Sequence, residues 1–139
     1  MPLIEEYLAQ GKPVKFSPRG ISMLPMLRQG VDSVILESYK GVPRKYDIPL
    51  YRRDDGCFVL HRVVKVGKTY TCIGDNQFNL EHGIRHDQII AIVTGFYRGT
   101  KYYSVNNMGY LLYSRIWHCS RGIRHFCGRC LAGIRRRLR

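Results

Sequence analysis

Short runs rich in Val, Ile, Tyr and Phe follow one another between residues 14 and 105, separated by Gly, Pro, Asp and Asn. Such runs predict β-strands, because branched and aromatic side chains fit a pleated, half-buried surface. Tight links between strands are expected at Gly67-Lys68 and at Arg98-Gly99-Thr100. The runs are PVKFS, DSVILES, DIPLYRR, CFVLHRVVKV, TYTCIGD, QIIAIVTGFYR and KYYSV. The expected fold class is mainly β, a compact antiparallel sheet or partly open barrel, with a short N-terminal helix, IEEYLAQG, ended by Gly11.

A different pattern begins after residue 109. Apolar side chains then recur at steps of three or four residues, which is the spacing of one face of an α-helix. They are Leu112, Ile116, Cys119, Ile123, Phe126, Cys130, Ile134 and Leu138. A chain of 139 residues fits one domain with an appendage. We therefore expect a β-rich domain over residues 1–109 and a basic amphipathic helical tail over residues 110–139.

The net charge of +13 at pH 7 is unevenly distributed. Residues 110–139 hold eight arginines and no acidic residue, a charge of +8, whereas residues 1–109 contribute only +5. The basic character therefore describes the partner of the tail and not the partner of the main domain.

The N-terminal segment MPLIEEYLAQGKP has the pattern of neither a signal peptide nor a membrane span, because Glu5 and Glu6 interrupt it. The five cysteines are an odd number, which favours free thiols in a reducing compartment. Cys57 and Cys72 lie in predicted strands and are expected to be small buried side chains. These features favour a cytoplasmic location in which any membrane contact is peripheral.

The stretch RGISMLPML combines the turn-forming residues Gly20 and Pro25 with several apolar side chains, among them Ile21 and Met23. A serine hydroxyl becomes a nucleophile when a base takes its proton and hydrogen-bond donors stabilise the oxyanion. Gly20 lets the backbone approach a substrate carbonyl and leaves the Ser22 N–H free to donate to it. The apolar residues anchor the turn on the domain, and Pro25 defines its exit. The stretch is therefore typical of a support for a nucleophilic serine.

Candidate partners for Ser22 lie further along the chain. His61 is the one histidine of the five inside a predicted strand. Gly74-Asp75-Asn76 closes the next strand, and Glu81 follows six residues after Asp75. Taken alone, a strand histidine is typical of a half-buried core position, and Gly-Asp-Asn is a common turn.

In this order and spacing, the three segments resemble the signal peptidase I family of serine peptidases. The resemblance is to the branch that uses histidine as base, which includes mitochondrial inner-membrane and endoplasmic-reticulum enzymes. GISMLPML resembles the nucleophile box of the family, VLHRVV its His-Arg-Val box, CIGDNQFN its Gly-Asp-Asn box, and IIAIVTGFYR its closing strand. The resemblance covers about residues 16–98.

This resemblance implies acyl transfer with Ser22 as nucleophile and His61 as general base. It also implies an acidic residue that orients the imidazole, for which both Asp75 and Glu81 are candidates. The chain departs from the family at Gly20, where many members place a serine, and in lacking the usual N-terminal membrane anchor. The expected substrate is a leader or precursor peptide, and no metal or organic cofactor is needed.

The tail has several possible partners. A basic face opposite apolar residues suits an anionic membrane surface, while a run such as GIRRRLR also suits nucleic acid phosphates, and the apolar stripe suits docking on the domain itself. The candidate membrane- or anion-binding residues are Arg115, Trp117, Arg121, Arg124, Arg135, Arg136 and Arg137. Two further functions fit the same fold, a catalytically inactive membrane- or peptide-binding module and a nucleic-acid-binding regulator.

A zinc site in the tail is a weaker alternative. CGRC has the spacing of a structural zinc knuckle, with Cys119 and His125 nearby. A second Cys-x-x-Cys pair is missing from the sequence, and Cys119 and Cys130 both fall on the apolar stripe. The pattern favours an amphipathic helix over a metal centre.

Overall fold

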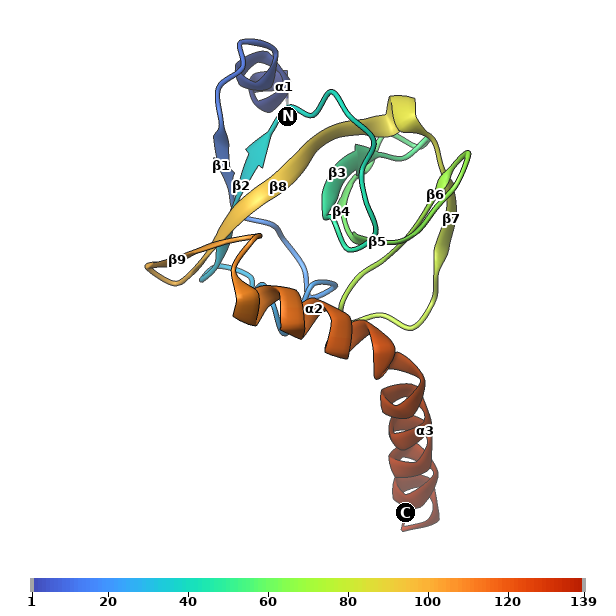
Figure 1. The fold of residues 1–139 in the computed structure, drawn as a ribbon. Coiled ribbons are helices and arrows are strands. Elements are labelled where there is room, and N and C mark those ends of the chain that lie inside the picture. The colour runs from blue at the N-terminus through green and yellow to red at the C-terminus, as the bar shows by residue number, and fades with distance from the viewer. Residues whose placement is uncertain (1, 139) are drawn as a thin grey trace.

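The computed structural model describes residues 2–138, which form two antiparallel sheets, an N-terminal helix and two C-terminal helices (Figure 1). The fold is thus mixed, with three α-helices and nine strands, and the strands of this described part do not close into a barrel. The helices are α1 (Pro2–Ala9), α2 (Met108–Cys119) and α3 (Arg121–Arg137), with one 3-10 turn at His86–Gln88. The strands are β1 (Val14–Phe16), β2 (Ser33–Glu37), β3 (Pro49–Arg52), β4 (Phe58–Leu60), β5 (Arg62–Val66), β6 (Tyr70–Ile73), β7 (Glu81–Ile84), β8 (Ile89–Arg98) and β9 (Lys101–Ser104).

The ten-residue strand β8 organises the larger sheet. One of its edges pairs with β2, while the other is shared between β3 at its start and β9 at its end. β1 and β4 extend the two sides, and β5, β6 and β7 form the smaller sheet. The antiparallel arrangement and the predicted link at Gly99 are confirmed, and Gly11 ends the N-terminal helix with a φ of 72°.

The main hydrophobic core joins the larger sheet to the serine-bearing turn. Met23, Met26 and Leu27 pack among buried residues of the sheet and of both flanking helices, including Leu8 and Tyr110. The turn is therefore anchored by apolar side chains, as its composition predicts, although Ile21 is exposed. Burial of these three side chains restricts the positions available to the loop.

His61 lies at the point where the chain passes from one sheet to the other. The sequence predicts a single strand through CFVLHRVVKV, and this is wrong: β4 pairs with β3, whereas β5 pairs with β6 in the second sheet. The residues of CFVLHRVVKV near His61 favour β structure, so the sequence does not show that the chain changes its partner strand there. His61 is consequently a buried residue between two strands rather than a member of one.

A second difference concerns the polar stretch after the Gly-Asp-Asn turn. It contains a strand, β7, that pairs with β6, and Glu81 is its first residue. This edge strand contains charged residues and a glycine, which have low strand propensity, so the sequence does not predict it. The pairing brings Glu81 back toward the end of β4, which sequence distance alone does not indicate.

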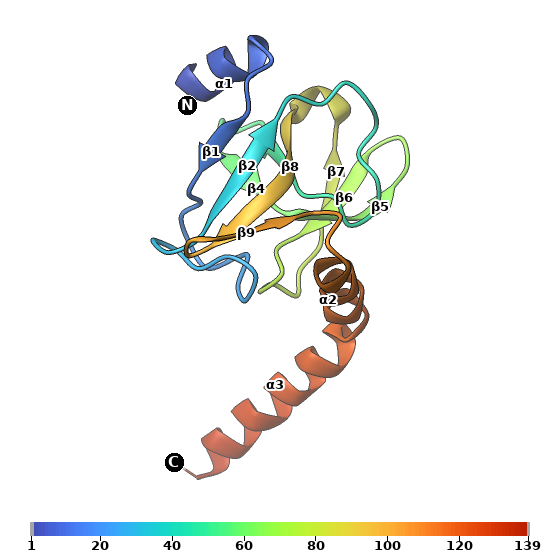
Figure 2. The ribbon, with the colours of Figure 1, turned by 60° about the vertical axis from the view of Figure 1, so that its left-hand side comes forward.

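The tail forms two helices instead of one continuous helix (Figures 1 and 2). At the junction, the Trp117 carbonyl accepts hydrogen bonds from Ser120 Oγ at 3.1 Å and from the Arg124 guanidinium at 2.6 Å. Side-chain donors that take a helix carbonyl compete with the backbone and bend the helix. Both views show α3 projecting away from the sheets while α2 lies against them.

The sequence left open whether the apolar stripe of the tail docks on the domain, and the structure shows that it does not. The face of α2 that meets the domain carries Tyr110, Tyr113, Ser114 and Trp117, whereas the stripe residues of both helices are exposed. The aromatic face has the same three- and four-residue spacing, so periodicity could not distinguish the two. Trp117, a candidate membrane-binding residue, therefore packs on the domain together with Tyr110 and Tyr113.

Two other findings concern exposure and membrane spans. Cys72 is buried as predicted, whereas Cys57 is exposed in the turn before β4, so its expected burial is wrong.

Among residues 2–138, none of the helices is long and apolar enough to cross a membrane.

Candidate active site

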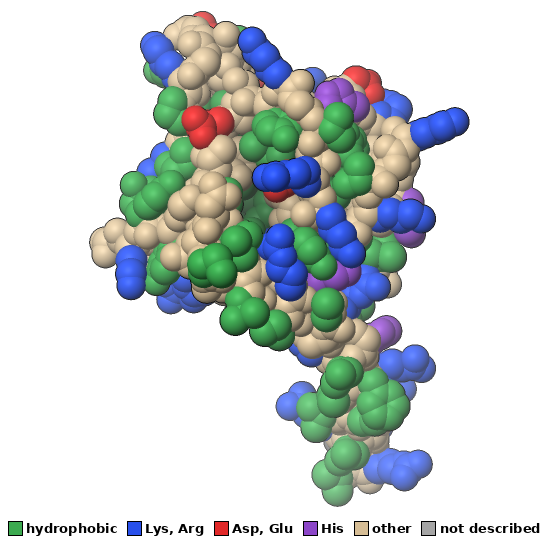
Figure 3. Space-filling model, in the orientation of Figure 1, with side chains coloured by type: hydrophobic (Ala, Val, Ile, Leu, Met, Phe, Trp, Pro, Cys, Tyr) green, Lys and Arg blue, Asp and Glu red, His purple; other side chains and the backbone are tan. Residues whose placement is uncertain are grey.

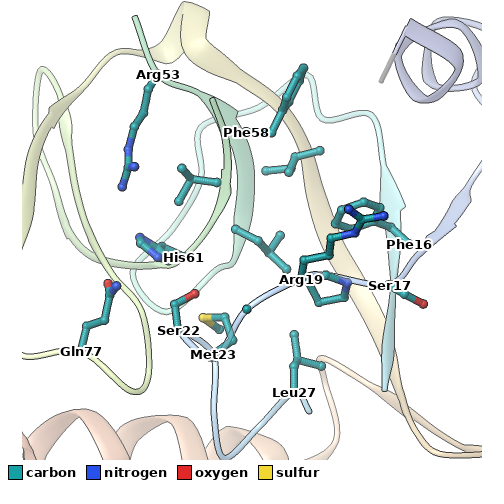
Figure 4. A pocket seen from close by; sticks show the side chains of 15 residues that line it. Phe16, Ser17, Arg19, Ser22, Met23, Leu27, Arg53, Phe58, His61 and Gln77 are labelled. Atoms are coloured by element: carbon teal, nitrogen blue, oxygen red, sulfur yellow. The ribbon is translucent and has the colours of Figure 1, made fainter. Parts of the chain in front are cut away.

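Ser22 and His61 line the same pocket, which has a volume of about 600 Å³ (Figure 4). Ser22 comes from the turn between β1 and β2, and His61 from the junction of β4 and β5. The apolar part of the wall is supplied by Phe16, Pro18, Met23, Leu27, Leu50, Phe58, Val59 and Leu60. Ser17, Arg19, Gly20, Arg53 and Gln77 contribute polar groups and backbone. Residues distant in sequence therefore meet at one half-open cavity.

Gly20 shapes the entry to the serine turn. Its φ of 90° lies in the left-handed region that glycine adopts without strain, and its N–H donates to Gln29 Oε1 at 2.7 Å. Met23 and Leu27 close the following turn through a backbone hydrogen bond of 2.9 Å. Within residues 2–138, the Ser22 N–H has no hydrogen-bond acceptor. This free donor beside the hydroxyl is available to an oxyanion.

The Gly-Asp-Asn turn holds the serine turn by its backbone. The Asn76 N–H donates to the Ser22 carbonyl at 2.8 Å. A Cβ at Gly74 would lie 2.5 Å from that same carbonyl oxygen, so only glycine permits this approach. The glycine and asparagine of the motif therefore position the backbone of Ser22, a role that its turn chemistry alone did not reveal.

The His61 ring is held by Tyr51 and Glu81. Tyr51 Oη donates to Glu81 Oε2 at 2.7 Å, and His61 Nδ1 lies 3.3 Å from Tyr51 Oη and 3.5 Å from Glu81 Oε2. Since the one hydroxyl proton of Tyr51 goes to the carboxylate, both groups facing Nδ1 are acceptors. Nδ1 therefore carries the proton in the neutral ring, which leaves Nε2 with a free lone pair. This is the tautomer that a general base requires.

The electrostatics keep the histidine neutral and the glutamate charged. Burial lowers the pKa of His61, and Arg53 adds to this effect, while Glu81 and Asp75 oppose it. The hydrogen bond from Arg53 holds the pKa of Glu81 below its usual range, and burial opposes this. Arg53 binds Glu81 through two hydrogen bonds, of 2.7 and 2.9 Å. At neutral pH the site thus presents a neutral imidazole next to a carboxylate.

Asp75 is joined to His61 by neither a hydrogen bond nor an ion pair, and the structure separates the two acidic candidates. Its carboxylate accepts two hydrogen bonds of 2.8 Å from Arg62 and one of 2.8 Å from Tyr113 Oη. Arg62 is 1 % exposed and also donates to the Tyr46 carbonyl and to Tyr110 Oη. The Arg of His-Arg-Val and the Asp of Gly-Asp-Asn therefore form a buried ion pair that joins the two motifs. Glu81 is the carboxylate beside the imidazole.

Ser22 and His61 line one pocket but are not hydrogen-bonded to each other. The hydrogen bonds of the described residues do not include one between Ser22 Oγ and a His61 nitrogen, although both side chains lie on the same side of the pocket (Figure 4). Such bonds are often long or poorly aligned in enzymes without substrate and tighten when substrate binds.

The remaining predicted residues lie away from this pocket. Pro25 is exposed, and its carbonyl accepts from Arg98 at 3.1 Å. In the tail, Trp117 Nε1 donates to the Asp75 carbonyl at 2.7 Å, and the Arg124 guanidinium lies 3.7 Å from the Trp117 ring centroid. The Arg115 guanidinium lies 4.6 Å from the Tyr46 ring centroid. Trp117 and Arg115 therefore take part in docking α2 on the domain, and Arg124 packs on Trp117. Arg121 is half-buried at the start of α3, and its buried Nη1 has no hydrogen-bond partner within residues 2–138, whereas Arg135, Arg136 and Arg137 are exposed.

Tyr51 and Arg53 are the site residues that the sequence did not identify. Both come from β3 and the turn after it, and neither belongs to a motif with a chemical signature. Only the pairing of β3 with β4 and the return of β7 place them around Glu81.

The chain matches no model of a known protein family, and none of the curated proteins matches it.

Proposed function

We propose that this protein is a serine peptidase of the signal peptidase type, with Ser22 as nucleophile, His61 as general base and Glu81 as the acid that orients it. The observation that carries the proposal is the shared pocket of Ser22 and His61, in which Nδ1 faces Tyr51 and Glu81. The resemblance of the three sequence segments to that family adds support. The reaction is hydrolysis of a peptide bond.

In the proposed mechanism, Ser22 Oγ attacks the scissile carbonyl carbon while His61 Nε2 accepts the hydroxyl proton. The oxyanion receives a hydrogen bond from the Ser22 N–H, which has no other acceptor in the described chain. Collapse of the tetrahedral intermediate breaks the C–N bond, and the imidazolium protonates the leaving amine. Water, deprotonated by His61, then hydrolyses the acyl-enzyme and regenerates Ser22.

The pocket suits an extended peptide segment. Its wall combines apolar side chains of β4 with the chain that leads from β1 to Ser22. The expected substrate class is a leader or precursor peptide whose cleavage site is unfolded, because a half-open pocket of about 600 Å³ admits side chains and not a folded domain.

Covalent labelling tests the assignment of Ser22. We expect a fluorophosphonate probe to add one adduct, with loss of fluoride, and the Ser22→Ala variant to lose it. Ser17 lines the same pocket and is exposed, so Ser17→Ala is the matched control and should label normally. Intact-mass measurement followed by peptide mapping identifies the site. An adduct on Ser17, or labelling that survives Ser22→Ala, contradicts the proposal.

The pH dependence of labelling tests the state of His61. Because burial lowers the pKa of His61 below 6.5, the ring remains a free base at pH values where an exposed histidine is half protonated. The labelling rate should therefore fall to half of its plateau only below pH 6.5. Glu81→Gln removes a charge that raises this pKa and should move the midpoint further down. A midpoint above pH 6.5 in the unmodified protein would contradict this assignment.

A second candidate function is a peptide-binding module that does not cleave its ligand. The lack of a hydrogen bond between Ser22 Oγ and His61 in the described residues favours it. Such a module would bind peptides in the pocket while the probe fails to label Ser22, so the same labelling experiment separates the two.

A further inference from the structure

The helix α3 exposes a row of large apolar side chains to solvent. Ile123, Phe126, Leu131, Ile134 and Leu138, the last at the C-cap, are all at least 54 % exposed. Their spacing of three to five residues places them on one side of the helix. Figure 3 shows this side as a hydrophobic patch on the projecting tail with basic side chains on both flanks. An exposed patch of this kind marks an interaction surface.

The charge around this patch is entirely positive. Residues 110–139 contain eight arginines and no acidic residue. Helical spacing places Arg129 and Arg136 on the side opposite Ile123 and Ile134, and Arg135 and Arg137 at the borders of the patch. The apolar side of α3 therefore matches an apolar layer, and its arginines match negative charge at the edge of that layer.

We propose that α3 lies on an anionic lipid bilayer, with its apolar side in the acyl region and its arginines among the headgroups. A second copy of the chain is disfavoured, because pairing two such helices would bring together only positive charges. Nucleic acid would neutralise the arginines but would leave the five apolar side chains in water. A bilayer accommodates both sides at once. The proposal is independent of the proposed peptidase function, since none of α3 lines the pocket of Ser22.

The first five residues of α3 hold the helix on the domain. His125 stacks on Phe78 with ring centroids 4.7 Å apart, and the Arg124 guanidinium covers the ring of Trp117. Residues after His125 have exposed side chains on all sides. The bilayer is thus expected to contact α3 from Phe126 onward while Trp117 keeps its place on the domain.

Co-sedimentation with vesicles tests the proposal. The full chain should bind vesicles of phosphatidylcholine with phosphatidylglycerol, bind far less to phosphatidylcholine alone, and bind more weakly as salt rises. Replacing Arg135, Arg136 and Arg137 by Gln should weaken binding about 100-fold, because each arginine near the headgroups contributes a factor of about five. Phe126→Ser with Ile134→Ser should weaken it at least about tenfold. The matched control is Leu3→Ser with Val42→Ser, which removes two equally exposed apolar side chains outside the tail and should change nothing.

Tryptophan fluorescence reports which residues enter the bilayer. The chain has one tryptophan, Trp117, whose indole N–H is bound to Asp75, so the unmodified protein should show no blue shift with vesicles. Phe126→Trp should show one. Equal binding to uncharged vesicles, unchanged binding by the serine variants, or binding to duplex DNA without binding to anionic vesicles would each overturn the proposal. Far-UV circular dichroism of each variant establishes that the domain is folded.

Discussion

His61→Ala is expected to slow covalent labelling of Ser22 about 10²- to 10⁴-fold at pH 7, the range that a positioned general base contributes. The physical reason is the tautomer: Nδ1 faces two acceptors, Tyr51 Oη and Glu81 Oε2, so Nε2 is free to take the serine proton. Removal of the imidazole leaves the hydroxyl without a base. The rate of adduct formation, followed by intact mass, measures the loss.

Variants around the ring distinguish positioning from catalysis. Glu81→Gln frees the Tyr51 hydroxyl proton and adds an amide donor, so Nδ1 becomes an acceptor and Nε2 acquires the proton. We expect this variant to lose about 10²-fold or more in labelling rate, by analogy with the wrong-tautomer effect in serine peptidases. Tyr51→Phe should lose less, because Glu81 remains within 3.5 Å of Nδ1. A Glu81→Gln variant that labels at the unmodified rate would contradict the role given to Glu81.

Asp75→Asn is expected to lower the free energy of unfolding by about 3–5 kcal/mol, the cost of leaving one partner of a buried ion pair uncompensated. The side chains of Arg62 and Asp75 are each only 2 % exposed, and two hydrogen bonds of 2.8 Å join them. The amide cannot balance the guanidinium charge. Urea unfolding followed by circular dichroism gives the difference, with linear extrapolation to water.

Two controls define what that loss means. Asp54→Asn removes one partner of an exposed ion pair with Arg85 and should leave the unfolding midpoint unchanged. The double variant Arg62→Met with Asp75→Leu removes both buried charges and should recover part of the lost stability. A loss below about 1 kcal/mol in Asp75→Asn would show that water reaches the pair. If Asp75 instead oriented His61, the labelling rate of folded Asp75→Asn protein would no longer show the pH midpoint that we assign to His61.

The sequence predicted those features that depend on local chemistry. Repeated short runs of branched and aromatic residues indicated antiparallel strands, Gly11 and Gly99 marked where a helix and a hairpin end, and Gly20 indicated a turn. The steps of three and four residues after residue 109 indicated a helical tail. Each of these is a property of a few neighbouring residues, so it can be recognised without knowing which segments meet.

Tertiary structure alone decided which side chains meet. Asp75 and Glu81 were equivalent candidates in the sequence, and only the burial of Arg62 beside Asp75 and the pairing of β7 with β6 assigned them to different partners. The exit of His61 from its strand, the contribution of Tyr51 and the choice between the two periodic faces of α2 were likewise set by long-range pairing. Hydrogen bonds and burial between distant segments depend on the whole topology, and the local pattern of residues does not encode them.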